Sequence, residues 1–411
     1  MAKILPFKAV RPTRDKVSLV ASRSYQSYTP EERDSRMDYN PYSFLHIVNP
    51  GYKFHQEISG EQRYTLVRNR YLEFKEEKIF IQDPVSMYYL YKIVNREGES
   101  FCGIIAAASV KDYESNVIRK HENTLTERET VFKEYLKTVG FNAEPVLLTY
   151  PDNKELENLI AQVVKDRPEY EFTTTCKDTH FLWNISEPAM VAIIEQVFEK
   201  IPVLYIADGH HRSASSYLLS EDITQSEENT GDSSYHYFMS YLIPESELRI
   251  YEFNRLIKDL NGLSKEEFLI KLDSCFRIEN RGLEVYKPSK AHHFSMYLDG
   301  EFYSLYLRKT EYTFENALDQ LDAQILYQTV LNPILDIKDL RTDTRIEYSH
   351  GKNDIVYVKG LIDQGEFKVG FNLYPATVDQ IKAIADQGLV MPPKSTYIEP
   401  KLRSGLTIYE F

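Results

Sequence analysis

A short apolar run at residues 203–207 (Val-Leu-Tyr-Ile-Ala) is followed at once by Asp208 and Gly209. A continuous apolar run of this length predicts a strand that is buried on both faces. From residue 211 onward, apolar side chains recur at helical spacing, which predicts a helix. The chain is therefore expected to turn sharply at 208–212, between a buried strand and the N-terminus of a helix.

The rest of the chain mixes strand and helix signals. Apolar and aromatic runs at 87–94 and 101–110 flank a polar turn, and two further runs flank Asp299-Gly300, so both pairs are predicted to be hairpins. Segments with helical spacing lie between the strands. This pattern predicts an α/β chain of the mixed α+β kind, with mixed, largely antiparallel sheets and flanking helices. A doubly wound parallel sheet is not favoured.

Three local features are also predicted. Thr126 and Glu129 have the spacing of a capping box at the start of a helix. Apolar residues between 318 and 330 predict one long helix, because they recur at helical intervals. The polar stretch 220–234 predicts an exposed loop.

The length of 411 residues suggests more than one domain. We expect an N-terminal α/β region at 1–245 that holds the active site, and a C-terminal α+β region at 246–411. One continuous unit remains an alternative.

Composition limits the classes of function. The three cysteines form neither a disulfide framework nor a zinc module, which fits a reducing cytoplasm. No window of about 18 apolar residues predicts a membrane span, and the start lacks a secretory signal. With 49 basic and 62 acidic residues, the net charge of −13 argues against a long nucleic-acid groove. A local basic pocket for a small anion stays open, and the oligomeric state is not predicted.

The turn at 208–212 carries five residues suited to phosphate chemistry. A helix N-terminus attracts anions, and Gly209 lets the backbone approach a ligand closely. Arg212 can hold phosphate oxygens, and His210 and His211 can donate hydrogen bonds or exchange a proton. Asp208 is a candidate magnesium ligand or catalytic base. Each residue alone also has a structural explanation, such as a helix cap or a surface charge; all five together favour function.

A second candidate stretch is 119–124 (Arg-Lys-His-Glu-Asn-Thr). His121 and Glu122 can supply acid–base chemistry. Arg119 and Lys120 can supply positive charge to a phosphate, with Thr124 as a further phosphate-binding candidate. The spacing is not that of a zinc protease helix. A solvated, charged helix entry is the structural alternative.

Four stretches, 40–46, 119–124, 206–212 and 391–396, resemble in the same order the domain-of-unknown-function family 1015 (DUF1015). The resemblance spans nearly the whole chain, but the family has no established activity to carry over. Within the last stretch, Lys394 is a candidate substrate-binding residue.

The Asp-Gly-His-His-Arg turn also looks like the phosphate-binding turn of the ParB and sulfiredoxin superfamily, which includes nucleotide-dependent kinases of free serine. This likeness implies that Asp208, Gly209, His211 and Arg212 surround the phosphates of ATP or ADP, with Mg²⁺ at Asp208. Most members of family 1015 carry Pro-Tyr-Asp in the first segment, where this chain has Ser-Tyr-Gln at 24–26. If that aspartate is catalytic in relatives, this chain has lost or changed the activity.

Three functions follow as hypotheses. The first is phosphoryl transfer from a nucleotide to a small hydroxylated metabolite, with free serine as one candidate acceptor. The second is a phosphoesterase or nuclease-like hydrolase that uses water as the acceptor. The third is a non-catalytic nucleotide-binding protein. The binding partners expected are therefore a nucleotide and a small-molecule substrate.

Overall fold

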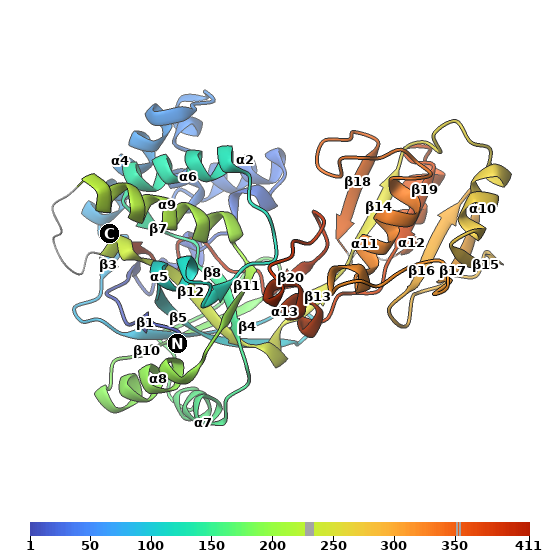
Figure 1. Ribbon diagram of the computed structural model, residues 1–411. Helices are drawn as coiled ribbons and strands as arrows, with labels where there is room; N and C mark the ends of the chain where they lie inside the picture. The colour runs from blue at the N-terminus through green and yellow to red at the C-terminus, as the bar shows by residue number, and fades with distance from the viewer. Residues whose placement is uncertain (227–233, 351, 353–354) are drawn as a thin grey trace. The chain divides into compact units, whose positions relative to one another are not determined.

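The computed structural model describes residues 1–226, 234–350, 352 and 355–411 (Figure 1). It divides into two compact units. The first unit comprises Met1–Lys120, Thr124–Leu248 and Pro400–Phe411, and the second comprises His121–Asn123 and Arg249–Glu399. The sequence predicts a boundary between two domains at residues 245 and 246, and this domain boundary stays a prediction.

The first unit is built on a nine-stranded sheet in the order β6-β11-β8-β12-β5-β4-β10-β9, with β1 also paired to β5. Only β6 with β11 and β8 with β12 run parallel among its described pairs, so the sheet is largely antiparallel as predicted. In chain order the strands are β1 (Ile4–Leu5), β4 (Tyr88–Val94), β5 (Ser100–Ser109), β6 (Ile118–Arg119), β8 (Val146–Tyr150), β9 (Tyr170–Thr173), β10 (Thr179–Ile185), β11 (Leu204–Asp208) and β12 (Tyr237–Pro244).

Helices cover both faces of this sheet (Figure 1). Buried side chains of α7 (Lys154–Val163) and α8 (Pro188–Lys200) join those of the central strands in one apolar core. On the other side α9 (His210–Ser226) contacts β8 and β12, α6 (Thr126–Val139) packs on α9, and α4 (Gly60–Glu76) packs on α6. The burial of both faces explains why β11 reads as an uninterrupted apolar run.

The remaining elements of the first unit are short. They are the helices α1 (Val17–Val20), α2 (Pro30–Tyr39), α3 (Leu45–Val48) and α5 (Val110–Glu114), the 3₁₀ helices η1 (Tyr25–Ser27), η2 (Pro50–Phe54), η3 (Ser234–His236) and η4 (Glu245–Glu247), and two ribbons, β2 (Val10–Pro12) with β3 (Phe80–Gln82) and β7 (Phe141–Asn142) with β21 (Tyr409–Glu410).

The second unit has a six-stranded antiparallel sheet in the order β15-β17-β16-β19-β14-β18. A two-stranded ribbon, β13 with β20, stands where the chain enters and leaves this unit, with Arg249 opposite Glu399. The strands are β13 (Arg249–Tyr251), β14 (Phe253–Ile257), β15 (Phe276–Gly282), β16 (His293–Leu298), β17 (Glu301–Leu307), β18 (Ile346–His350), β19 (Val369–Asn372) and β20 (Tyr397–Glu399), and the α-helices are α10 (Lys265–Asp273), α11 (Asp322–Leu326), α12 (Ile355–Asp363) and α13 (Val378–Asp386).

Both predicted hairpins are confirmed, as β4–β5 and β16–β17. The single long helix predicted at 318–330 is wrong: the segment forms the 3₁₀ helix η5 (Leu318–Gln320), α11 and a π-helical turn, η6 (Tyr327–Leu331). Leu321 is extended between the first two. The side chains of Asn316 and Asp319 accept hydrogen bonds from nearby backbone N–H groups, which compete with a continuous helix.

Two further local predictions need correction. The N-cap of α6 is Leu125 and has no side-chain cap, so the capping box at Thr126 is wrong. The Glu129 carboxylate instead accepts a hydrogen bond from the Thr124 hydroxyl. The predicted loop at 220–234 begins as helix, because α9 continues to Ser226; residues 227–233 lie outside the described residues. Within the described ranges, no helix combines the length and the apolar character that crossing a bilayer would require.

The packing of α12 on its sheet predicts that alanine substitutions at two nearby glycines change the free energy of unfolding in different directions. A Cβ at Gly370 in β19 would lie 2.3 Å from Val358 Cγ1 of α12, whereas a Cβ at Gly360 within α12 would meet nothing within 4 Å. We expect Gly370→Ala to lower the free energy of unfolding by about 1–3 kcal/mol, because the helix must move off the sheet. Gly360→Ala should be neutral or stabilising by up to about 1 kcal/mol. Urea unfolding of both variants measures this, and equal effects would contradict it.

Candidate anion-binding site

The strand–turn–helix forms as predicted, with β11 ending at Asp208 and α9 beginning at His210. Gly209 joins them with a φ of +100°, a backbone conformation that side chains with a Cβ rarely adopt. Its carbonyl accepts the N–H groups of Arg212 and Ser213 and so closes the first helical turn. The pairing of β11 with β8 shifts register between Ile206 and Asp208, a β-bulge of the kind that re-aims the residues at a strand end.

The Arg212 guanidinium folds back over Gly209. A Cβ on Gly209 would lie 2.9 Å from two guanidinium nitrogens. Arg212 Nη1 lies 2.8 Å from Glu144 Oε1 and donates to the Pro145 carbonyl at 2.9 Å. Arg212 Nη2 lies 4.0 Å from Asp208 Oδ1. One edge of the guanidinium is therefore anchored to the 144–145 segment, and the other faces the Asp208 carboxylate.

Asp208 is contacted from the far end of the chain. Lys401 Nζ donates to Asp208 Oδ2 at 2.9 Å, and both side chains are nearly half exposed. Burial raises the pKa of the Asp208 carboxyl, but the charges of Lys401 and Arg212 outweigh that effect and lower it to about 2. Asp208 is thus ionised at neutral pH. Together with Glu144 it gives two negative charges against the two positive charges of Lys401 and Arg212.

The two histidines of the turn differ. His210 is 5% exposed, whereas His211 is half-buried. Burial lowers the pKa of His210 to about 3, although the Asp208 charge opposes the shift. His210 is therefore a neutral imidazole at pH 7, suited to donate one neutral hydrogen bond, and not a cationic phosphate ligand.

Part of the 119–124 stretch lies beside the turn. Strand β6 runs parallel to β11, with Arg119 opposite Tyr205, so both strands end at the same edge of the sheet. The ammonium of Lys120, which also lies over the Tyr113 ring at 5.5 Å, contributes to the lowered pKa of His210. Arg119 and Lys120 therefore belong to the surroundings of the turn, as does α6, which begins just after Thr124 and packs on α9.

His121, Glu122 and Lys394 belong to the second unit. His121 is buried, and its carbonyl accepts the Met391 N–H at 2.9 Å, so two of the four stretches that resemble the family meet within this unit. Glu122 is half-buried. Lys394 is exposed, with a φ of +56° and its ammonium 5.2 Å from the centre of the Phe253 ring.

Residues 24–26, which depart from the family pattern, are connected to the turn through a series of contacts. Gln26 is exposed in η1. Just before it, Ser22 and Ser404 exchange two backbone hydrogen bonds, and the Ser404 hydroxyl donates to Glu144 at 3.3 Å. Glu144 in turn holds Arg212. Sequence reasoning does not select Glu144 or Lys401 as site residues, because no local pattern marks either one.

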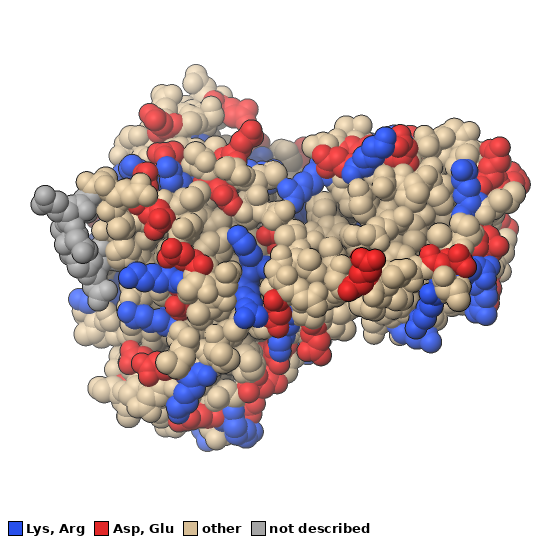
Figure 2. Space-filling view, viewed as in Figure 1, with Lys and Arg blue, Asp and Glu red and all other residues tan. Residues whose placement is uncertain are grey.

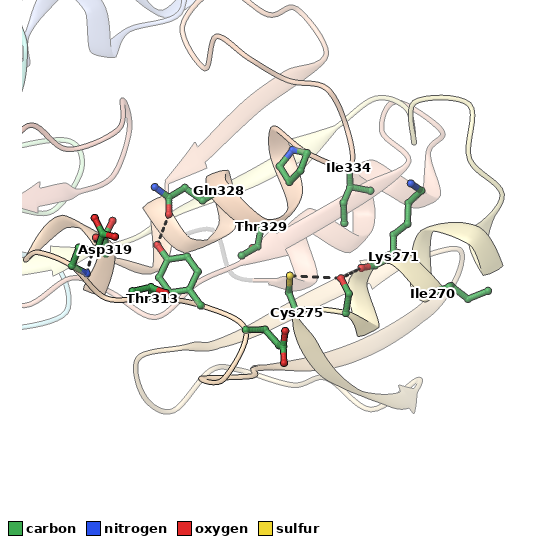
Figure 3. A pocket seen from close by; sticks show the side chains of 13 residues that line it. Ile270, Lys271, Cys275, Thr313, Asp319, Gln328, Thr329 and Ile334 are labelled. Carbon is green, nitrogen blue, oxygen red and sulfur yellow. Dashed lines mark hydrogen bonds between the residues drawn. The ribbon is translucent and has the colours of Figure 1, made fainter.

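One cavity in the second unit contains none of the predicted site residues. It has a volume of about 860 Å³ and lies between the end of α10, the 311–315 segment and η6. Figure 3 shows its lining side chains, among them Cys275 and the hydrogen bond from Tyr312 to Gln328. Three acidic side chains and one lysine line an otherwise uncharged wall.

Charged side chains of both signs alternate over the face seen in Figure 2, with no broad basic field.

The chain belongs to the family described as "Protein of unknown function (DUF1015)", whose family model matches residues 4–324. This confirms the family resemblance of the sequence. No curated protein shows a significant match.

Three solved structures share a distant likeness. A free serine kinase variant in complex with AMP is 12% identical, with a TM-score of 0.37 over 74% of this chain and 91% of its own. SbnI with a C-terminal truncation from Staphylococcus aureus is 12% identical, with a TM-score of 0.38 over 74% and 85%. A conserved hypothetical protein from Pyrococcus furiosus is 12% identical, with a TM-score of 0.33 over 73% and 91%. Likeness at this level does not carry their activities to this chain.

The turn predicts a sensitivity to side-chain bulk at Gly209. Gly209→Ala must place a Cβ at a φ of +100° and against the Arg212 guanidinium, whereas Gly98→Ala meets a φ of +84° with nothing within 4 Å. Each backbone strain costs about 1–3 kcal/mol. We expect the Gly209 variant to be the less stable of the two in urea unfolding. Equal losses would show that the guanidinium moves aside without cost.

The ion pairs at Asp208 predict a dependence of stability on acid. The pKa of Asp208 is depressed in the folded state, so its contribution is full above the ordinary value of 3.8 and is lost as the pH falls toward about 2. We expect Asp208→Asn to lose about 1 kcal/mol at pH 7, after allowance for solvent screening of these half-exposed pairs. The gap from the wild type, measured by urea unfolding, should shrink from pH 4 to pH 3. A gap independent of pH would contradict this.

Proposed function

We propose that the protein is a nucleotide-dependent phosphotransferase that acts on a small hydroxylated metabolite, with free serine as the first acceptor to test. The observation that carries the proposal is the glycine turn at the end of a buried strand, where Arg212 lies over Gly209 at the N-terminus of a 17-residue helix. A helix N-terminus and a guanidinium at one point favour a phosphate group. Free serine is chosen as the acceptor because the turn resembles that of the free serine kinases.

Arg212 is positioned for this role by its neighbours. Glu144 and the Pro145 carbonyl both contact Nη1, so they fix the plane of the guanidinium. The Nη2 edge then meets the phosphate oxygens. Arg119, Lys120 and Thr124 follow as further phosphate-binding candidates, supported by the parallel pairing of β6 with β11.

Asp208 fits a magnesium ligand. Its carboxylate is ionised at neutral pH and is partly exposed, and Mg²⁺ binds through one or two carboxylates together with substrate phosphates. When bound there, Mg²⁺ neutralises phosphate charge as it develops during transfer.

The proton of the acceptor hydroxyl needs a base. His210 adjoins Asp208 in the turn and is one candidate, although its lowered pKa makes it a weak base; His211 is the neighbouring candidate. His121 and Glu122 follow Lys120 directly along the chain, and the Lys120 charge acts on His210. Each of these four residues is a candidate for the acid–base role, and Lys394 is the candidate for holding the acceptor.

Isothermal titration tests nucleotide binding. The wild type should bind ATP or ADP with Mg²⁺, and Arg212→Ala should weaken binding by roughly 10- to 100-fold, because a charge-assisted hydrogen bond contributes about 1.5–3 kcal/mol. Arg14→Ala is the matched control, since it removes an exposed arginine–carboxylate pair of 2.9 Å in the same unit. Absence of binding by the wild type would refute the proposal.

Transfer itself is followed by ³¹P NMR with a panel of hydroxylated metabolites that includes free serine. His211→Ala should lower the rate by about 10²-fold or more at saturating nucleotide, as expected for a general acid or base. Phosphate release that does not require any acceptor would instead support the hydrolase. Binding without turnover across the panel would support the non-catalytic nucleotide-binding protein, in line with the Gln26 departure.

A further inference from the structure

Lys401 occupies a place that the sequence pattern of the turn does not reveal. Its ammonium lies 2.9 Å from Asp208 Oδ2, while Arg212 approaches the other oxygen of the same carboxylate. Two cations thus flank one carboxylate at the N-terminus of α9. Lys401 is 45% exposed and Asp208 is 40% exposed, so the pair is open to solvent.

The segment that carries Lys401 is fixed at several points. Arg403 lies 3.3 Å from Asp178, and it is itself 7% exposed. Ser404 pairs with the backbone of Ser22, and the Gly405 N–H donates to the Ala143 carbonyl. A Cβ on Gly405 would lie 2.6 Å from the Phe44 ring, so this segment is tightly packed. Lys401 is therefore delivered to Asp208 by a rigid backbone and not by a mobile tail.

The balance of charges around Asp208 indicates a role for Lys401. Asp208 and Glu144 offset Lys401 and Arg212, so the four side chains sum to zero. A divalent cation that takes Asp208 leaves a surplus of positive charge on the two basic residues, and that surplus attracts the phosphates that accompany the cation. A lysine ammonium suits this exchange, because it is a compact charge with three rotatable donors.

We propose that Lys401 is a second phosphate-binding cation of this site, which exchanges its contact with Asp208 for a phosphate oxygen when a divalent cation and a nucleotide bind. This inference rests on the proposed function. It adds a residue from the opposite end of the chain, and it makes phosphate affinity and metal binding interdependent.

The experiment measures the affinity of the full-length chain for Mg·ATP by isothermal titration. Lys401→Met should weaken binding by at least 10-fold, and Lys401→Arg should restore it to within about 3-fold of the wild type. Lys154→Met is the matched control: Lys154 also pairs with a carboxylate at 2.8 Å, but in α7, which carries no residue of the site. Its affinity should equal that of the wild type.

A second measurement separates a phosphate contact from a structural role. Adenosine, which has no phosphate, should bind Lys401→Met and the wild type alike, and the thermal unfolding midpoint should fall by no more than the loss of one exposed ion pair explains. If the wild type binds Mg·ATP and Lys401→Met binds it equally well, the role of Lys401 is refuted while the proposed function stands. If Lys401→Met loses adenosine and Mg·ATP in parallel, Lys401 is structural and the inference is again overturned. If the wild type binds no nucleotide, the proposed function itself fails.

Discussion

The first unit depends on the return of residues 400–411 after the chain has left it to form the second unit. Backbone hydrogen bonds join this returning segment to Val10, Ser22 and Gly140, and its last strand, β21, pairs with β7. Ile408 is fully buried in the same apolar cluster as Phe44 and Phe141. The same segment closes the core and carries Lys401. The packing of residues 400–411 therefore also determines where the Lys401 charge lies relative to Asp208.

The charged side chains at the turn (Glu144, Asp208, Arg212 and Lys401) orient one another more than they stabilise the fold. Their ion pairs are partly exposed, and exposed pairs each contribute at most about 1 kcal/mol. Their effect is to orient: Glu144 fixes one edge of Arg212, and Lys401 keeps Asp208 ionised. A site that must bind a highly charged group gains from charges held in place in this way, because only side-chain contacts have to change when the ligand arrives.

The sequence predicts the parts of the site that local patterns encode. The apolar run before Asp208, the glycine and the following helical spacing are all signals within about 15 residues, and that turn forms as predicted. Lys401 and Glu144 could not be found in this way, because each reaches the turn through tertiary contacts across long stretches of chain. The same limit applies to Thr126, whose capping-box spacing was correct but whose partner Glu129 is taken by Thr124.

Burial also altered the chemistry that residue type alone suggests. The negative charge of Asp208 favours the protonated form of His210, yet the buried environment of this histidine keeps its ring neutral. Arg212 and His210 therefore carry different charges beside the same carboxylate, and burial keeps His210 neutral even at acidic pH.

The second unit is inserted in the sequence of the first, and this order along the chain has a consequence for biosynthesis. Leu248 and Pro400 flank the inserted part, so the ribosome must complete the whole of the second unit before it makes the segment that closes the first. Until then the nascent first unit lacks Ile408 in its core and exposes apolar surface that the finished chain buries. The core of the first unit can therefore be completed only after the second unit has been synthesised.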